Sequence, residues 1–250
     1  MSTGDTIILT DSRDDQAYAV GKLADGNCWL LDNLALDLTN NTVLNGMNES
    51  NTNASNTTLG YLKNGGGTTS DQYAITGVVN WTDSPTYASS YSYSDPLVNL
   101  TNKDVIPSDA TSQDGQYKVG GYYNYCAASA GSYCYGNGTS WGTSSGNATE
   151  DICPKGWRMP TGNTSGEYQA LYNNASYNSY ANYRAALHLP LSGGFYSGSA
   201  GDQGSYSSWW SSTRYSINGM HTLYAGTSSI YPANSCSRDY GNSVRCVLGS

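Results

Sequence analysis

The sequence predicts a single α+β domain of short strands, long irregular loops and a few helices. Two local patterns lead to this prediction. Residues 17–23 and 27–31 are apolar runs on either side of Asp25-Gly26, a dipeptide typical of tight β-hairpin turns. Residues 164–167, Thr-Ser-Gly-Glu, match a capping box, which predicts a helix that begins near Glu167. A chain of 250 residues accommodates such a fold as one domain.

The remaining elements are predicted from composition. Residues 29–38 hold a Trp and several Leu that supply much of the core. Residues 39–116 are rich in Asn, Thr, Ser and Gly, which predicts a polar insert of long loops with short strands such as 74–81. The Tyr-rich residues 117–125 are expected to form a strand, and residues 180–189 a second helix. Beyond Pro190 we expect short strands and turns to the end of the chain.

The charge of the chain argues against two classes of partner. It carries 11 Lys and Arg residues against 19 Asp and Glu residues, for a formal net charge of −8. Nucleic acids and anionic membranes both require a basic protein face. No stretch approaches the roughly 18–20 apolar residues of a membrane span. We therefore expect no nucleic-acid partner and no membrane insertion, and residues 1–10 lack the pattern of a signal peptide.

Six cysteines raise the question of disulfides. The short Gly-containing loop between Cys126 and Cys134 favours that pair first, and Cys153 with Cys246 is the second expected pair. The alternative is six reduced and mostly buried thiols. No Cys-x-x-Cys pair occurs and the chain has only two His, so a zinc site is not expected.

Five segments, in order, resemble the Fibrobacter succinogenes major paralogous domain: Asp11-Ser12-Arg13-Asp14, Trp29 with Asn33-Leu34, Cys153-Pro154-Lys155-Gly156-Trp157-Arg158-Met159-Pro160-Thr161, Trp210-Ser211-Ser212-Thr213, and Gly241-Asn242-Ser243-Val244-Arg245-Cys246-Val247. The resemblance covers about residues 11–38 and 117–247, roughly two thirds of the chain, and leaves residues 39–116 as the insert.

Part of this series is also similar to formylglycine-generating enzymes. Arg158-Met159-Pro160-Thr161 followed by Glu167-Tyr168 resembles their Arg-Leu-Pro-Thr…Glu-Trp segment, and Val244-Arg245 resembles their closing Gly-Phe-Arg. Here Tyr168 replaces the Trp, and extra residues separate Thr161 from Glu167. The resemblance implies their variant of the C-type lectin fold.

The same scaffold carries the variable proteins of diversity-generating retroelements, whose hypervariable segment lies near the C-terminus. The resemblance implies a variable region at about residues 204–243. These retroelements change adenines, typically in Asn codons that can never become Trp, Met, Lys, Gln or Glu. Residues 204–244 contain no Lys, Gln or Glu, and Trp209, Trp210 and Met220 would then be scaffold. Arg214 and Arg245 are expected to form structural ion pairs.

Enzymatic chemistry finds little support in the sequence. His188 and His221 have no recognisable Ser or Cys partner motif, and no phosphate-binding Gly loop precedes a helix. The formylglycine-generating reaction would require a reactive Cys pair, for which Cys236 and Cys246 are the candidates. The resemblance to C-type lectins does not extend to their calcium-binding sugar motifs. Three scattered carboxylates, Asp83, Asp95 and Asp104, lack EF-hand spacing, so we expect no cofactor, although a structural calcium ion is compatible with the sequence.

The composition of residues 204–240 is typical of a binding surface. Antibody paratopes are rich in Tyr, Ser, Gly and Asn, because Tyr buries a large rigid ring and the others adapt their hydrogen bonds. We expect a non-enzymatic ligand-binding protein of the cell surface or extracellular space that recognises a protein or cell-surface ligand. The candidate ligand-binding residues are Tyr206, Ser208, Tyr215, Ser216, Asn218, His221, Tyr224, Tyr231, Asn234, Arg238, Asp239 and Tyr240.

This hypothesis places Tyr206, Tyr215, Tyr224 and Tyr231 outward on one face. The abundance of Tyr and Ser throughout the chain is the plain alternative to a localised site. Two other functions stay open: a non-diversified adhesin or carbohydrate-binding lectin-like module, and, more remotely, an oxidase of the formylglycine-generating type.

Overall fold

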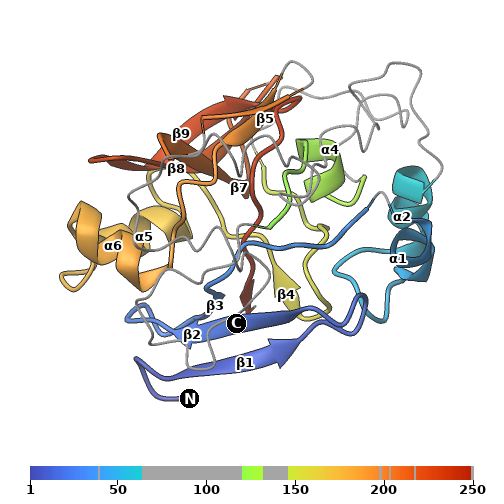
Figure 1. The fold of residues 1–250 in the computed structure, drawn as a ribbon, viewed down its shortest axis with the longest axis horizontal. Helices are drawn as coiled ribbons and strands as arrows, with labels where there is room; N and C mark the ends of the chain where they lie inside the picture. The colour runs from blue at the N-terminus through green and yellow to red at the C-terminus, as the bar shows by residue number, and fades with distance from the viewer. Residues whose placement is uncertain are drawn as a thin grey trace.

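The protein has a mixed α+β fold in which antiparallel sheets lie at two ends of the molecule and helices lie between and beside them (Figure 1). The structure is a computed structural model. It describes residues 1–38, 40–63, 120–131, 146–196, 199–202, 204–216 and 218–248. The strand expected at residues 74–81 lies outside these ranges, as do Asp83, Asp95 and Asp104.

The sheet near the chain ends has five strands in the order β1-β2-β3-β10-β4. Their bounds are β1 Thr6–Thr10, β2 Ala17–Lys22, β3 Cys28–Leu30, β10 Val247–Leu248 and β4 Trp157–Arg158. The predicted hairpin is confirmed as β2 and β3. Gly26 in its turn has a φ of +85°, which favours glycine, and the Asp25 carboxylate accepts a hydrogen bond from the Trp29 indole at 2.9 Å.

The second sheet is built from the C-terminal third of the chain. It contains β7 (Tyr206–Arg214), β8 (Gly219–Gly226) and β9 (Ile230–Ser237) in sequential order. A short hairpin of β5 (Gly194–Tyr196) and β6 (Ser199–Gly201) lies next to it. On the free edge of β7, Gly193 pairs with Ser207 and Ser243 pairs with Trp209. The C-terminal segment therefore runs along this sheet before it enters the five-stranded sheet as β10.

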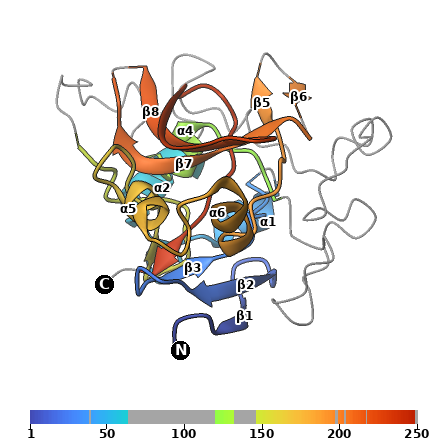
Figure 2. The same cartoon turned by 90° about the vertical axis from the view of Figure 1, so that its left-hand side faces the viewer.

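Two helices lie between the sheets, α5 (Glu167–Asn173) and α6 (Tyr180–Ala186), and both were predicted (Figure 2). The start at Glu167 is confirmed, but the capping-box mechanism is wrong. The N-cap is Gly166, which has no side chain to offer, and Thr161 Oγ1 accepts the hydrogen bond from Glu167 N at 2.9 Å. The Glu167 carboxylate instead binds both terminal nitrogens of Arg158 at 2.7 Å.

Three further helices occur where the sequence predicted loops or a strand: α1 (Asn41–Gly46), α2 (Asn56–Lys63) and α4 (Tyr125–Ala128). The first part of the expected insert is therefore part of the folded core, because Val43, Leu44, Met47, Leu59 and Leu62 are buried in it. In the Tyr-rich segment, residues 120–124 form only isolated bridges rather than a strand.

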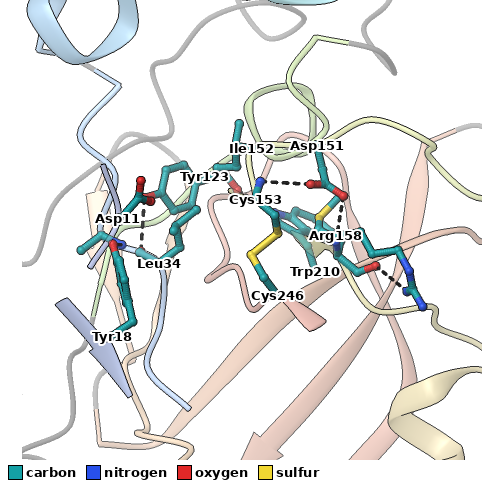
Figure 3. The surroundings of a disulfide bond; sticks show 12 residues. Asp11, Tyr18, Leu34, Tyr123, Asp151, Ile152, Cys153, Arg158, Trp210 and Cys246 are labelled. Carbon is teal, nitrogen blue, oxygen red and sulfur yellow. Dashed lines mark hydrogen bonds between the residues drawn. A yellow bond between two sulfur atoms is a disulfide. The ribbon is translucent and has the colours of Figure 1, made fainter. Parts of the chain in front are cut away.

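A disulfide joins the loop before β4 to the C-terminal segment. Cys153 and Cys246 are bonded, as predicted (Figure 3). The pairing expected for Cys126 cannot be followed here because Cys134 lies outside the described residues. Beside the disulfide, the buried Asp151 carboxylate accepts hydrogen bonds from the backbone N–H groups of Cys153 at 3.0 Å and Met159 at 2.7 Å.

Arg245 lies next to this disulfide and is fully buried. Its guanidinium donates to the backbone carbonyls of Leu31 at 2.5 Å, His188 at 2.8 Å and Leu187. Its Nε donates to Asn33 Oδ1 at 2.8 Å. Three segments far apart in sequence therefore meet at one cation, and the acceptors in these hydrogen bonds are carbonyl and amide oxygens.

Replacing this cation tests its structural role. In Arg245→Met, the carbonyls of Leu31, Leu187 and His188 stay buried without their donor, so we expect the free energy of unfolding to fall by at least about 3 kcal/mol. Urea denaturation with the disulfide intact measures this. The exposed cation Lys155 provides the control, since Lys155→Met should change stability by less than about 0.5 kcal/mol. Equal effects of the two substitutions would contradict the role of Arg245.

Two buried groups predict an unusual pH dependence of stability. Burial raises the pKa of Asp151 from 3.8 to about 6, although its backbone hydrogen bonds oppose the shift. Burial, and after it the charge of Arg245, lowers the pKa of His188 from 6.5 to about 3. Between about pH 6 and pH 4 the folded state binds a proton at Asp151 before the unfolded chain does, so Asp151 adds stability as pH falls. His188 does the opposite, because there only the unfolded chain binds the proton.

We therefore expect the opposite effects of Asp151 and His188 on the free energy of unfolding to cancel in part in the wild-type protein. In Asp151→Asn, stability should decline more steeply on acidification across this window, by an amount on the order of 2 kcal/mol. In His188→Asn, stability should rise on acidification instead, and Asn tolerates the left-handed φ of +47° at this position. Urea denaturation midpoints at pH 6.5, 5 and 4 measure this dependence. If both variants kept the wild-type dependence of stability on pH, the shifted pKa values of Asp151 and His188 would be refuted.

Candidate functional site

Three tyrosines form a row of ring contacts across the C-terminal sheet, one on each strand. The rings of Tyr206 on β7 and Tyr224 on β8 stack with centroids 5.4 Å apart. Tyr224 pairs directly with Tyr231 on β9, and their ring centroids are 5.6 Å apart. Gly226 faces Tyr206 across the strands, and a Cβ there would lie 3.2 Å from the Tyr224 hydroxyl. The glycine therefore leaves room for Tyr206 to lean onto Tyr224.

A second tyrosine pair continues this row through a carboxylate. Asp202 accepts hydrogen bonds from the hydroxyls of Tyr196 and Tyr206. Tyr196 in turn packs against Tyr240, with ring centroids 5.6 Å apart. We call the side chains of Tyr196, Tyr206, Tyr224, Tyr231 and Tyr240, together with Asp202, the tyrosine surface.

The tyrosine surface lies outside the core. Tyr231 and Tyr240 are 57% and 41% exposed, and Tyr206 and Tyr224 are half-buried. Partial burial, and after it the neighbouring Asp202, raises the pKa of Tyr206. Its hydroxyl therefore remains a proton donor at physiological pH.

Two fully buried indoles fix the strand that carries Tyr206. Trp209 donates its indole N–H to Asn33 Oδ1 at 2.7 Å, and Trp210 donates to the Tyr123 carbonyl at 2.6 Å. The edge of the Tyr125 ring also meets the Trp210 ring at 5.2 Å. Indoles with both packing and hydrogen-bond partners hold a strand in a single register, so the tyrosines project from a rigid support.

Tyr215 lies outside the core but on the other side of the sheet. It is 62% exposed and packs edge-on against His221, with ring centroids 5.2 Å apart. Neighbouring residues of a strand point to opposite faces, and His221 is an odd number of residues from Tyr224 on β8. The structure thus separates Tyr215 and His221 from the row formed by Tyr206, Tyr224 and Tyr231, in contrast to the expectation of one common face.

The remaining predicted residues occupy different positions. Ser216 and Asn218 are exposed between β7 and β8, and Asp239 is exposed after β9, where it accepts a hydrogen bond from Ser237 at 2.5 Å. Asn234 and Arg238 are half-buried, and the Asn234 carbonyl contacts His221 Nδ1 at 3.1 Å.

Ser208 is a correction, because it is only 5% exposed. It lies directly opposite Tyr224, and the segment that contains Ser243 hydrogen-bonds along its strand. Ser208 therefore lies on the same face of the sheet as Tyr206 and Tyr224, but its burial keeps it from facing a ligand.

Sequence reasoning missed Tyr196 and Asp202. The same Tyr, Ser and Gly composition that marked residues 204–240 begins before them, at residues 193–206. An earlier start for that window would have included Tyr196. Asp202 has no such signal, because its role depends on a backbone with a φ of +61° that turns it toward both hydroxyls.

The cysteines and the possible metal ligands bear on two other kinds of chemistry. The Cys pair considered for an oxidase is not formed, because Cys246 is bonded to Cys153 and Cys236 is a half-buried free thiol. Burial raises the pKa of Cys236. Among the described residues no group of three or more His, Cys, Asp or Glu is placed to hold a metal ion. None of the helices described has the length and apolar character needed to cross a membrane.

The comparisons with known proteins give no relative from which an activity could be transferred. No protein-family model matches the chain, and neither the curated proteins nor the solved structures contain a match.

Proposed function

We propose that this is a non-enzymatic binding protein that contacts its ligand through the tyrosine surface. The observation that carries the proposal is that the rings of Tyr206, Tyr224 and Tyr231 pack against one another in a row outside the core, on a sheet fixed by buried Trp209 and Trp210. Rings held by their neighbours lose little conformational entropy on binding, and a tyrosine combines a large apolar ring with a hydroxyl that can bond to a partner. A protein or a surface polymer presents the mixture of apolar and polar groups that suits this surface.

We also propose that the scaffold is the C-type lectin variant implied by the sequence resemblance. Its support is that the resembling segments contact one another, directly or through residues that adjoin them. Arg13 donates to the Ile152 carbonyl at 2.6 Å, Asn33 receives hydrogen bonds from both Trp209 and Arg245, and Cys153 is bonded to Cys246. Segments that contact one another are expected to keep their sequence together, because a change in one would break its contacts with the others, while segments outside these contacts are free to vary.

Diversification by a retroelement is the third part of the proposal. Trp209, Trp210 and Met220, which adenine-directed changes at Asn codons cannot produce, are all completely buried. The exposed positions in the same region are residues that such codons can give, such as Tyr215, Ser216 and Tyr231. This division between fixed interior and changeable exterior is what supports a variable region here.

A matched pair of substitutions tests which face binds. Tyr231→Ala and Tyr215→Ala remove the same side chain at similarly exposed positions on opposite faces of the sheet. On an array of purified cell-surface glycans and proteins, we expect Tyr231→Ala to weaken the wild-type binding signals at least about tenfold, which is the size of a hot-spot effect. Tyr215→Ala should leave them unchanged. Binding that depends on Tyr215 and not on Tyr231 would reject the proposed surface.

Sequencing the coding region in several isolates tests diversification separately. Substitutions should concentrate at the exposed positions of residues 204–243, while Trp209, Trp210 and Met220 stay constant, and an adjacent reverse transcriptase with a template copy should accompany them. An unvarying region without these genes would identify a binding module of fixed specificity.

A further inference from the structure

Strand β1 is an uncovered apolar edge at the opposite end of the molecule from the tyrosine surface (Figures 1 and 2). Among the described residues, β2 is the one strand that pairs with it, and no described element lies beyond it. Ile7, Ile8 and Leu9 are 41%, 40% and 39% exposed. Natural sheet edges usually carry charges, proline or a bulge that prevents pairing, and the sequence Thr-Ile-Ile-Leu-Thr has none of these.

The hydrogen-bond register shows which backbone groups face outward. Lys22 N donates to Asp5 O at 3.0 Å and Asp11 N donates to Gln16 O at 2.7 Å, so residues 5 and 11 are hydrogen-bonded positions toward β2. These positions alternate along an antiparallel pair, which directs residues 7 and 9 to β2 as well. The N–H and C=O groups of Thr6, Ile8 and Thr10 are consequently directed away from the sheet.

We propose that β1 pairs in antiparallel fashion with β1 of a second copy of this chain, with the twofold axis at Ile8. In that register Ile8 faces Ile8 and Thr6 faces Thr10, so the outward backbone groups of each copy meet those of the other. Ile7 faces Leu9 on the side of the sheet that holds Val20 and Tyr18. The strand reads almost the same in both directions, which is the condition for a self-complementary interface.

Charge and size both limit the strength of this pairing. No charged side chain lies within Thr6–Thr10, but the register places the exposed Asp5 of one copy opposite Asp11 of the other. Asp11 is ion-paired with Arg13 at 2.6 Å, which partly offsets this repulsion. A five-residue strand buries less than the roughly 1,200 Å² typical of a stable interface. Each copy also carries a net charge of −8. The dimer should therefore dissociate on dilution and strengthen with added salt.

The pairing would have a consequence for recognition. β1 and the sheet of β7–β9 lie at opposite ends of the molecule (Figure 1), so the pairing leaves both tyrosine surfaces accessible. A dimer could then engage two ligands on one cell or polymer, with a gain in avidity. This consequence rests on the proposed function, whereas the dimer itself does not.

Sedimentation across a range of protein concentrations tests the dimer. We expect the wild-type protein to shift from monomer to dimer as concentration rises. Ile8→Lys, which places two ammonium groups face to face, should raise the dissociation constant at least about tenfold. Tyr215→Lys makes the same charge change far from β1 and should leave the constant unaltered. A monomer at all concentrations, or a dimer indifferent to Ile8→Lys, overturns the proposal.

Cysteine substitution tests the register independently of folding losses. Ile8→Cys should form an intermolecular disulfide under mild oxidation, because residue 8 faces itself at a spacing that a disulfide can bridge. Thr6→Cys alone should not, because residue 6 faces residue 10. The wild-type protein, which keeps Cys28 and Cys236, sets the background. Cross-linking of Thr6→Cys as efficient as that of Ile8→Cys would overturn the proposed register.

Discussion

The arrangement of this protein depends on satisfying one buried cation. Arg245 is removed from water completely, and a guanidinium in that position is tolerated only when oxygen atoms surround it. The oxygens come from the segment after β3, from the end of α6 and from the Asn33 side chain. None of these segments can move without leaving either the cation or its acceptors unsatisfied. The C-terminal segment is thereby held between the two sheets.

Asn33 transmits this constraint to the sheet that carries the tyrosines. Its Oδ1 accepts from both Arg245 and Trp209, and its Nδ2 donates to Ser243 Oγ at 3.2 Å. The amide therefore joins the cation, an indole of β7 and the segment that runs along the edge of β7. Because β7 is fixed from below and from its edge, the exposed rings need not contribute to stability. The buried polar groups of Asn33, Arg245 and Trp209 are hydrogen-bonded to one another in the interior, so the exposed tyrosines are not needed to satisfy them.

The sequence predicted elements whose signal is local and missed those whose signal is spread out. Asp25-Gly26 specifies its turn by backbone conformation alone, and α5 begins at Glu167 as expected. The cap was wrong because Arg158 claims the Glu167 carboxylate, a contact that only the tertiary fold creates. α1 and α2 were missed because their few apolar residues are diluted by Asn and Thr. For the site, residue type indicated the tyrosines, but strand alternation separates Tyr215 from the row, and burial within the fold removes Ser208 from the surface.

A surface of stacked phenols differs from a charged site in how it responds to substitution. A charged site depends on the spacing of a few groups, so a single change abolishes it or leaves an uncompensated charge. Here the exposed rings contact mainly one another, and the buried indoles retain their own hydrogen-bond partners whichever side chains lie outside. Exchanging Tyr231 for another polar residue changes the chemistry offered to a ligand without exposing the core. The same scaffold can therefore support many specificities, which is the physical requirement that a diversified binding protein has to meet.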